Sequence, residues 1–404
     1  MQKVDQKSHF EFVALMAALM SVVALAIDAL LPAIPDIGQA IGSPDPTDNQ
    51  LLVTMIFLGL GAGQLFFGPI SDSIGRKPVV YIGFIIFLLA SVLCLYAPSL
   101  EVMVVGRIFQ GIGLAAPRTI AISIIRDSYD GDRMARVMSF VTAFFILVPI
   151  IAPALGKMIM DLSGWEGIFY AQMVLALAVG LWFWKRQRET LPLEYKIPFN
   201  VQNVLHGFRE FFKYRQTVVF TLISGLLNGA FLVYLSTAQH IFENQYSLKE
   251  SFPFIFAGLA FSIGISTFLN GTLVMRFGMR RLSITASIVF CLVALLYALL
   301  FRDAPNPGIH VLLGFLSVQF LCLGFMWGNF RSLAMEPIGH IAGVGAAING
   351  FVSTMISIPI ATFIGSFVGV TVWPLFTGLA VCGLCALGIY LVFGDPRGRN
   401  LSPA

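Results

Sequence analysis

The ten-residue stretch Gly68-Pro-Ile-Ser-Asp-Ser-Ile-Gly-Arg-Lys77 is followed, 203 positions later, by a second copy of its pattern. The second copy reads Gly271-Thr-Leu-Val-Met-Arg-Phe-Gly-Met-Arg280. Both copies keep two glycines seven residues apart and end on a cation, whereas only the first copy carries an acid at its fifth position. The offset is close to half of the 404-residue chain. A repeat of this period predicts two halves that share one internal architecture.

Apolar segments of membrane-spanning length surround both copies. About 20 apolar residues cross a bilayer as a helix, and we find twelve such segments, at about 12–34, 50–70, 79–97, 101–124, 136–160, 167–186, 216–241, 251–273, 281–301, 309–333, 341–367 and 372–393. The strict alternation that is typical of a transmembrane β-barrel is absent from the sequence. The sequence therefore predicts an all-α membrane protein with twelve transmembrane helices.

The composition excludes several other classes of protein. The chain is 57% hydrophobic and 11% charged, with a mean hydropathy of +0.86, whereas soluble domains carry about 25% charge. A soluble protein, a disordered chain and a secreted disulfide scaffold are therefore excluded. A net charge of +4 is too small to indicate a nucleic-acid partner. The cysteines all lie in apolar segments, where we expect them to pack rather than react, at Cys94, Cys291, Cys322, Cys382 and Cys385.

The basic residues predict the orientation in the membrane. If the N-terminus is cytoplasmic, 20 of the 25 Lys and Arg residues lie in inside segments, and only Lys157, Lys249 and Arg302 lie outside. The remaining two, Arg107 and Arg118, lie within the fourth apolar segment. The positive-inside rule then predicts that both termini are cytoplasmic. The first apolar segment is long enough to span and lacks a small-residue cleavage site, so we expect a transmembrane helix there rather than a signal peptide.

A long polar loop at about 187–215, with Pro192 and Pro198, separates six apolar segments from six others. We predict an N-terminal six-helix bundle at 1–186, a cytoplasmic linker at 187–215 and a C-terminal six-helix bundle at 216–404. Parallel repeats of this kind are typical of membrane transporters, in which a central cavity holds the substrate.

One acid, Asp28, lies well within an apolar segment, whereas the other acids fall in loops or near segment ends. Counting along the two segments places Arg107 at a similar depth in the membrane. An ionisable residue in the bilayer is costly, and it usually marks a proton or substrate pathway. We therefore predict a proton site at Asp28, beside Arg107. The alternative is a static buried ion pair that holds the first and fourth helices together.

Further polar residues are candidates for a substrate cavity. Gln110 and Arg118 project from nearly the same helical face as Arg107, although Arg118 could instead snorkel to the inner interface. In the C-terminal half, polar or aromatic residues lie inside apolar segments at Asn228, Tyr234, Gln319, Trp327, Asn329 and Asn349. Hydrogen bonding between helices explains any one of these equally well.

Two further groups of residues suggest moving parts. Asp72 and Asp127 are plausible partners for Arg76 at the inner face, where they could form a breakable latch; Lys77 is better explained as a positive-inside anchor. In the fifth segment, Pro149, Pro153 and Gly156 weaken the helix and permit close packing, as a hinge or as a static kink.

The sequence contains no metal-ligand cluster, phosphate-binding loop, nucleophile elbow or pair of catalytic carboxylates. We therefore expect neither an enzyme nor a cofactor.

Three of these patterns resemble motifs of the major facilitator superfamily. The stretch 68–78 resembles its motif A, with Gly68, Asp72, Gly75, Arg76 and Lys77. The residues 107–113 are similar to motif B of helix four, and the residues 149–156 to motif C, which is typical of antiporters. Together with Ile27-Asp28-Ala-Leu-Leu-Pro32 in helix one, they most resemble the bicyclomycin/chloramphenicol resistance (Bcr/CflA) drug efflux family.

This resemblance implies proton-driven export of drugs from the bacterial cytoplasm, with Asp28 as the proton site and Arg107 as its coupling partner. It implies a protein of the inner membrane that works as a monomer, with protons and a small molecule as its partners. The sequence departs from the motifs at Ser73, Ala152 and Lys157, and the C-terminal repeat has Met275 where motif A has its acid. Each departure weakens the expected latch or the expected helix packing.

Two other functions fit the same patterns. One is a proton-coupled carrier of a specific metabolite, such as a nucleoside or a sugar, because fold does not settle function. The other is a membrane sensor that binds a ligand without moving it, although the duplicated halves and the buried Asp28 argue against it.

Overall fold

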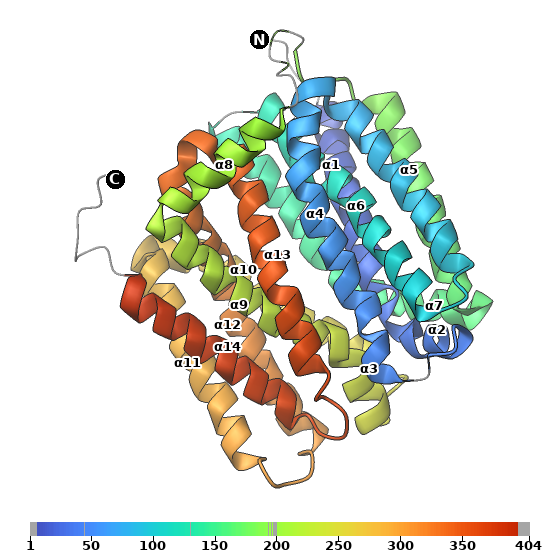
Figure 1. The fold of residues 1–404 in the computed structure, drawn as a ribbon, viewed down its shortest axis with the longest axis vertical. Helices are drawn as coiled ribbons and strands as arrows, with labels where there is room; N and C mark the ends of the chain where they lie inside the picture. The colour runs from blue at the N-terminus through green and yellow to red at the C-terminus, as the bar shows by residue number, and fades with distance from the viewer. Residues whose placement is uncertain are drawn as a thin grey trace. The chain divides into compact units, whose positions relative to one another are not determined.

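A computed structural model describes residues 6–43, 45–129, 131–192, 194, 196 and 200–394, and the regular structure in this part of the chain is helical throughout (Figure 1). The termini that carry Lys3, Arg397 and Arg399, and the linker residue Pro198, lie outside the described residues. The predicted all-α fold is confirmed. The chain forms two compact units, one of Met1–Asp45 with Met55–Asn200 and the other of Pro46–Thr54 with Val201–Ala404.

The first unit begins with a helix that ends earlier than the sequence predicts. It contains α1 (Gln6–Asp28), η1 (Leu31–Ala33), α2 (Ile34–Ala40), most of α4 (Leu51–Ile74), α5 (Arg76–Leu95), α6 (Leu100–Ser128) and α7 (Gly131–Arg186). The predicted continuous helix at 12–34 is wrong in one respect, because α1 ends at Asp28 and a short 3-10 turn follows. Pro32 and Pro35 lack the backbone N–H that a continuing helix needs. Asp28 therefore lies at the end of a helix, inside an apolar segment.

The helix α7 contains two of the predicted membrane crossings. Its backbone is non-helical at Gly164, with φ 76° and ψ 178°. The part Leu147–Arg186 has 40 residues, about 60 Å of helix, which is twice the ~30 Å core of a bilayer. Ten other apolar helices of spanning length occur in the described residues. The break at Gly164 thus gives the twelve crossings that the sequence predicts.

The second unit contains α3 (Pro46–Asn49), α8 (Val201–Lys213), α9 (Arg215–Gln239), the π-helical turn η3 (His240–Gln245), α10 (Phe252–Phe277), α11 (Met279–Leu300), α12 (Ile309–Met335), η4 (Glu336–Ile341), α13 (Ala342–Gly365) and α14 (Trp373–Phe393). The helix α9 lies at its centre, packed against α12, α13 and α14. The amphipathic helix α8 corrects the prediction of a loop throughout 187–215.

The two copies of the repeated stretch adopt the same turn. Gly75 separates α4 from α5 with φ 111°, and Gly278 separates α10 from α11 with φ 80°. Residues other than glycine rarely adopt these angles. The second glycine of each copy is thus explained by the backbone that it must form.

Close helix approaches hold the first unit together. A Cβ added at Gly111 would overlap the backbone of α4 at Ile56, and one added at Gly113 would lie 2.6 Å from the Gly83 carbonyl of α5. Small residues permit such contacts between helices in membranes. The helix α6 is therefore fixed against two neighbours, and its side chains have defined positions.

Candidate functional site

The structure places Asp28 and Arg107 in the core of the first unit. Asp28 is the last residue of α1 and is 6% exposed, and Arg107 lies on α6 and is fully buried. Contacts between α1 and α6 bring the two helices together. A charge at such a position requires partners, because burial of an unpaired ion is costly.

The Arg107 guanidinium is held at the end of α1 by two hydrogen bonds. Its Nη1 atom donates to the carbonyl oxygen of Ala26 at 3.2 Å and to Oε1 of Gln110 at 2.8 Å. The Ala26 carbonyl precedes Asp28 by two residues. Within the described residues no ion pair of 4.0 Å or less joins Arg107 to the Asp28 carboxylate. The cation is therefore anchored next to the acid through the backbone of α1.

Two residues that the sequence analysis did not identify complete this arrangement. Ser91 of α5 accepts a hydrogen bond from Nε2 of Gln110 at 2.8 Å, which fixes the amide that in turn binds Arg107. Gln172 of α7 donates to the carbonyl oxygen of Leu25 at 3.5 Å. Neutral polar residues are common within spans, so the sequence carried no signal that set Ser91 and Gln172 apart.

The predicted helix-five element lies against the same end of α1. A Cβ at Gly156 would overlap the backbone of Ala29, the residue that follows Asp28. Pro153 is buried and Pro149 half-buried on the same stretch of α7. The departures at Ala152 and Lys157 therefore do not prevent close packing at Gly156. The site is built by α1, α6 and α7 together.

The predicted motif-A residues form a second cluster, at the end of α4. Arg76, which is 3% exposed, donates from Nη1 to Oδ1 of Asp72 at 2.5 Å and from Nε to Oδ2 of Asp127 at 2.9 Å. Ser71 accepts a further bond from Nη1 at 2.6 Å. Gly68 has open space around it and Lys77 donates to the Trp184 carbonyl at 3.4 Å. The structure thus brings Asp72, Arg76 and Asp127 together; we call these three residues the inner cluster.

Glu189, which the sequence analysis also missed, caps the helix that starts at the inner cluster. Its carboxylate accepts the backbone N–H groups of Arg76 and Lys77, both at 3.0 Å, and those of Thr190 and Leu191. Burial alone would raise the pKa of Glu189, but the N–H groups outweigh burial and hold its pKa below the ordinary value of 4.5. A carboxylate at the N-terminus of a helix also interacts favourably with the helix dipole. Glu189 therefore ties the start of the linker to α5.

The polar candidates of the second unit make helix-to-helix contacts. Asn349 donates to Thr221 at 2.7 Å, Gln319 donates to the Phe290 carbonyl at 3.0 Å, and Asn329 pairs reciprocally with Asn270. These contacts match the alternative explanation, hydrogen bonding between helices. The remaining polar candidates, half-buried on their helices, are Arg118 on α6 and Asn228 on α9.

An aromatic cluster surrounds Phe231 in the second unit. The ring centroid of Trp327 lies 4.9 Å from that of Phe231, edge to face, and the ring of Tyr234 lies 6.3 Å from it. Phe320 and Phe256 continue the cluster on α12 and α10. The structure thus brings two of the predicted cavity residues, Tyr234 and Trp327, into one apolar environment.

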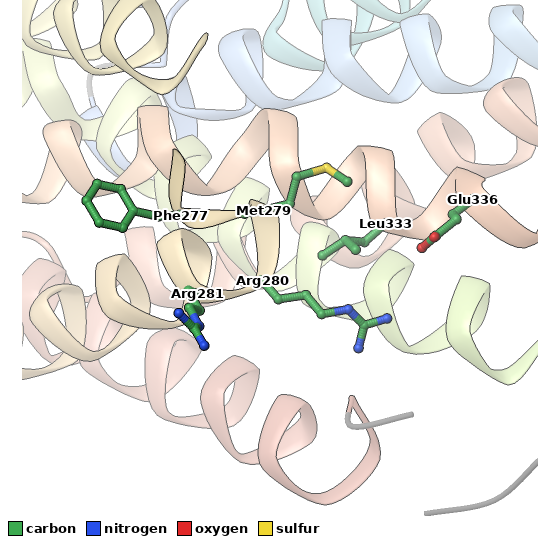
Figure 2. Close-up of a pocket in the computed structure, with 7 residues that line it drawn as sticks. Phe277, Met279, Arg280, Arg281, Leu333 and Glu336 are labelled. Carbon is green, nitrogen blue, oxygen red and sulfur yellow. The ribbon is translucent and has the colours of Figure 1, made fainter. Parts of the chain in front are cut away.

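A surface hollow of about 270 Å³ lies at the second copy of the repeated stretch (Figure 2). Arg280 and Glu336 extend on either side of Leu333 in this view, while Arg281 extends in another direction. Arg280 donates to the Gly394 carbonyl at 3.0 Å, and Glu336 accepts from Gln216 at 2.9 Å. Both polar groups are thus already engaged, and none of the predicted site residues lines the hollow.

The described residues contain no group of three or more His, Cys, Asp or Glu side chains that could hold a metal ion.

Comparisons with known proteins agree with this architecture. The family model described as Major Facilitator Superfamily matches residues 16–361. The chain is 27% identical over 375 residues to the multidrug resistance protein MdtL of Klebsiella pneumoniae, covering 92% of each chain. It is 24% identical over 413 residues to a bicyclomycin resistance protein homolog of Haemophilus influenzae, covering 98% of each. Among solved structures, the xylose transporter XylE of E. coli in a partially occluded inward-open conformation superposes with a TM-score of 0.73 at 13% identity, covering 98% of this chain and 100% of that one.

Proposed function

Because the chain belongs to the Major Facilitator Superfamily, we propose that it is a proton-coupled exporter of drugs or other small amphipathic compounds. The observation that carries the proposal is that Asp28 of α1 and Arg107 of α6 are both buried, with Arg107 bonded to the α1 backbone two residues before Asp28. Relatives named for multidrug resistance and bicyclomycin resistance support the substrate class. Export by antiport requires a site at which binding of the proton weakens binding of the substrate, and binding of the substrate weakens binding of the proton.

The carboxylate of Asp28 can make binding of the proton and binding of the substrate mutually unfavourable. An ionised carboxylate in an apolar site is costly unless it is paired, so a proton and a bound substrate can each relieve the same cost. When the site faces outside, protonation of Asp28 favours release of the substrate. When the site faces the cytoplasm, loss of the proton favours substrate binding. The linkage is reciprocal, so downhill proton entry drives substrate exit.

Arg107 gives Asp28 a fixed electrostatic environment. Its bonds to Ala26 and Gln110 hold the guanidinium beside the end of α1, and neither bond uses the carboxyl group of Asp28. Gly156 allows α7 to contact the residue next to Asp28, so a change of bend at Pro153 would reach the acid directly. We propose Gln110 and Arg118 of the first unit and Asn228, Tyr234 and Trp327 of the second as residues that contact the substrate. The bonds of Gln319 and Asn349 to neighbouring helices favour a packing role for these two earlier candidates.

The inner cluster and its cap would serve the conformational step. Arg76 joins Asp72 of α4 to Asp127 of α6 through two ion pairs. A movement of α4 away from α6 would break this network, as the change between inward-facing and outward-facing states requires. The charge distribution supports a bacterial inner membrane protein with both termini in the cytoplasm. In that orientation the cluster lies on the cytoplasmic side. We propose that the protein works as a monomer.

A substrate panel in proteoliposomes tests the proposed function. Purified protein is reconstituted with an acidic lumen, and uptake of chloramphenicol, a lipophilic cation, a nucleoside and a pentose is measured with and without the pH gradient. Gradient-driven uptake of the first two compounds supports drug:proton antiport. Saturable uptake of only the nucleoside or the pentose replaces the proposal with a metabolite carrier. Binding without any counterflow replaces it with a sensor.

A further inference from the structure

The helix α8 has three faces of different chemistry. The helix has 13 residues. Gly207 and Phe211 lie on its first face, Leu205 and Phe212 on the second, and Arg209 on the third. At 100° per residue these three faces follow each other around the helix. Phe208 lies at the border of the first two faces.

The first face is packed against α13, as the crossing of the two helices in Figure 1 illustrates. Phe211 is fully buried, and a Cβ at Gly207 would lie 2.5 Å from Cγ1 of Val344. The Phe208 ring meets the Phe351 ring edge to face, with centroids 6.4 Å apart. These contacts fix the rotation of α8 about its own axis and therefore the direction of its other two faces.

The second face is apolar and exposed. Leu205 is 57% exposed and Phe212, seven residues later, is 52% exposed. They lie on one stripe, two turns apart, and each keeps more than half of its surface exposed among the described residues. Exposed apolar area costs about 25 cal/mol per Å² in water, so this stripe favours an apolar environment.

The third face is basic. Arg209 and Lys213 are both exposed, four residues apart. Lys213 pairs with Glu210 at 2.7 Å, but exposed pairs of this kind contribute little and leave the ammonium available to other anions. An apolar stripe bordered by cations is the pattern of helices that lie in the interface of an anionic membrane.

The chain then places α8 at the membrane surface. It ends at Lys213, and α9, which spans the bilayer, begins at Arg215. One residue cannot carry the chain far from the interface, so α8 lies within reach of the headgroups. We propose that α8 is an interfacial membrane helix, with Leu205 and Phe212 among the acyl chains and Arg209 and Lys213 bound to the phosphates of anionic phospholipids. This proposal is independent of the transported substrate.

Photo-crosslinking in nanodiscs tests the apolar contact. The photoreactive residue p-benzoylphenylalanine is placed in the full chain at position 205, at 212 or, as a control on the side of α8 away from this stripe, at 210, in discs of 20% phosphatidylglycerol and 80% phosphatidylcholine. Mass spectrometry should find lipid adducts at 205 and 212 and at least fivefold fewer at 210. The proposal is overturned by equal yields at all three positions. It is also overturned by adducts of 205 and 212 with protein, which would show a protein partner on this face.

A charge change tests the lipid class. Phosphatidylglycerol should exceed its 20% share among the adducts at 212. Arg209→Gln should lower the affinity of the protein for phosphatidylglycerol about fivefold, and Lys213→Gln should lower it by a similar factor. The control Lys249→Gln with Arg302→Gln removes two exposed cations elsewhere and should leave the enrichment unchanged. Adducts at 212 without any enrichment, or with equal loss in the control, contradict the binding of anionic headgroups. Circular dichroism of each variant ensures that only folded protein is compared.

Discussion

Arg107 is the residue whose contacts are most specific. One guanidinium nitrogen serves both the Ala26 carbonyl and the Gln110 amide, which in turn binds Ser91. This chain joins α1, α6 and α5 in a fully buried environment. A point charge of the same sign cannot reproduce it, because arginine and lysine differ in shape and in the number of donors.

We therefore predict that Arg107→Lys lowers proton-driven uptake at least tenfold. Loss of one hydrogen bond to a charged group costs about 1.5–3 kcal/mol, which corresponds to a factor of ten or more. Initial uptake rates in proteoliposomes measure the effect. The matched control is Arg126→Lys, an exposed residue of α6, which should change the rate less than twofold. Equal rates for the two variants would show that the geometry of Arg107 is irrelevant to transport.

Glu189 gives a prediction for pH. Its pKa is held below the ordinary value in the folded protein, so its contribution to stability is complete above pH 4.5 and is lost as the pH falls further, through the folded pKa. Glu189→Gln should lower stability by about 1 kcal/mol at pH 7, as loss of a helix cap does. Thermal unfolding in detergent at pH 7 and at pH 3.5 should show that the difference between wild type and variant shrinks in acid. A difference that grows in acid contradicts the assignment.

At the scale of elements, the contact between α7 and the end of α1 controls the geometry around Asp28. Gly156 permits this contact because a side chain there would overlap the Ala29 backbone. Gly156→Ala should therefore cost about 1–3 kcal/mol through overpacking, and it should lower transport by displacing Asp28. Gly258→Ala in α10 meets nothing within 4 Å and is the matched control. Gly156→Ala should have a lower thermal midpoint and a lower uptake rate than Gly258→Ala. Similar midpoints and rates in the two variants would refute the close contact at Gly156.

The two glycine turns allow a comparison between the halves of the repeat. Both Gly75 and Gly278 have positive φ, so alanine should cost about 1–2 kcal/mol at each. At Gly75 the new methyl would also lie 2.7 Å from Oε2 of Glu189, whereas at Gly278 it would have open space. We expect Gly75→Ala to lower the thermal midpoint more than Gly278→Ala does. The reverse order would mean that the Glu189 cap is absent in the membrane.

The parts of these elements that sequence reasoning could predict are those that depend on local properties. The length of each apolar segment predicted the twelve crossings. The turn that Gly75 and Gly278 share was not predicted, although both glycines stand in the repeated pattern. The position of Asp28 at a helix end depended on the proline residues that follow it, a local signal that the prediction of one helix over 12–34 did not use. The helix α8 was missed because the prolines at 192 and 198 suggested a loop throughout.

The rest of the candidate site depends on contacts that no local pattern contains. Glu189 is 113 residues from Arg76 along the chain, and Gln172 is 147 residues from Leu25. Neither residue is part of a recognisable sequence pattern, and only the packing of the helices brings each one to its partner. Asn349 and Gln319, by contrast, were selected as candidates for a cavity, but their contacts lie between helices. Sequence alone could not separate such residues from those that face a cavity.

At the scale of the whole molecule, the proposed function places one coupling acid in one of two repeated halves. The second copy of the repeated stretch keeps the turn but has Met275, 87% exposed, where the first has Asp72. The inner cluster and the buried Asp28 thus belong to the first unit, while the aromatic cluster around Phe231 belongs to the second. We infer that the first unit couples the proton and that the second contributes mainly apolar surface for the substrate.

Proton release on addition of drug tests this account most directly. Inverted membrane vesicles hold an imposed acidic lumen, and an internal pH probe follows the addition of chloramphenicol to wild type, Asp28→Asn and Asp303→Asn, in which an exposed loop acid is replaced. We predict drug-induced proton efflux in the wild type and in Asp303→Asn, and none in Asp28→Asn, with expression and folding of the three proteins matched. Proton efflux that persists in Asp28→Asn at the wild-type rate would contradict the central claim that Asp28 carries the exchanged proton.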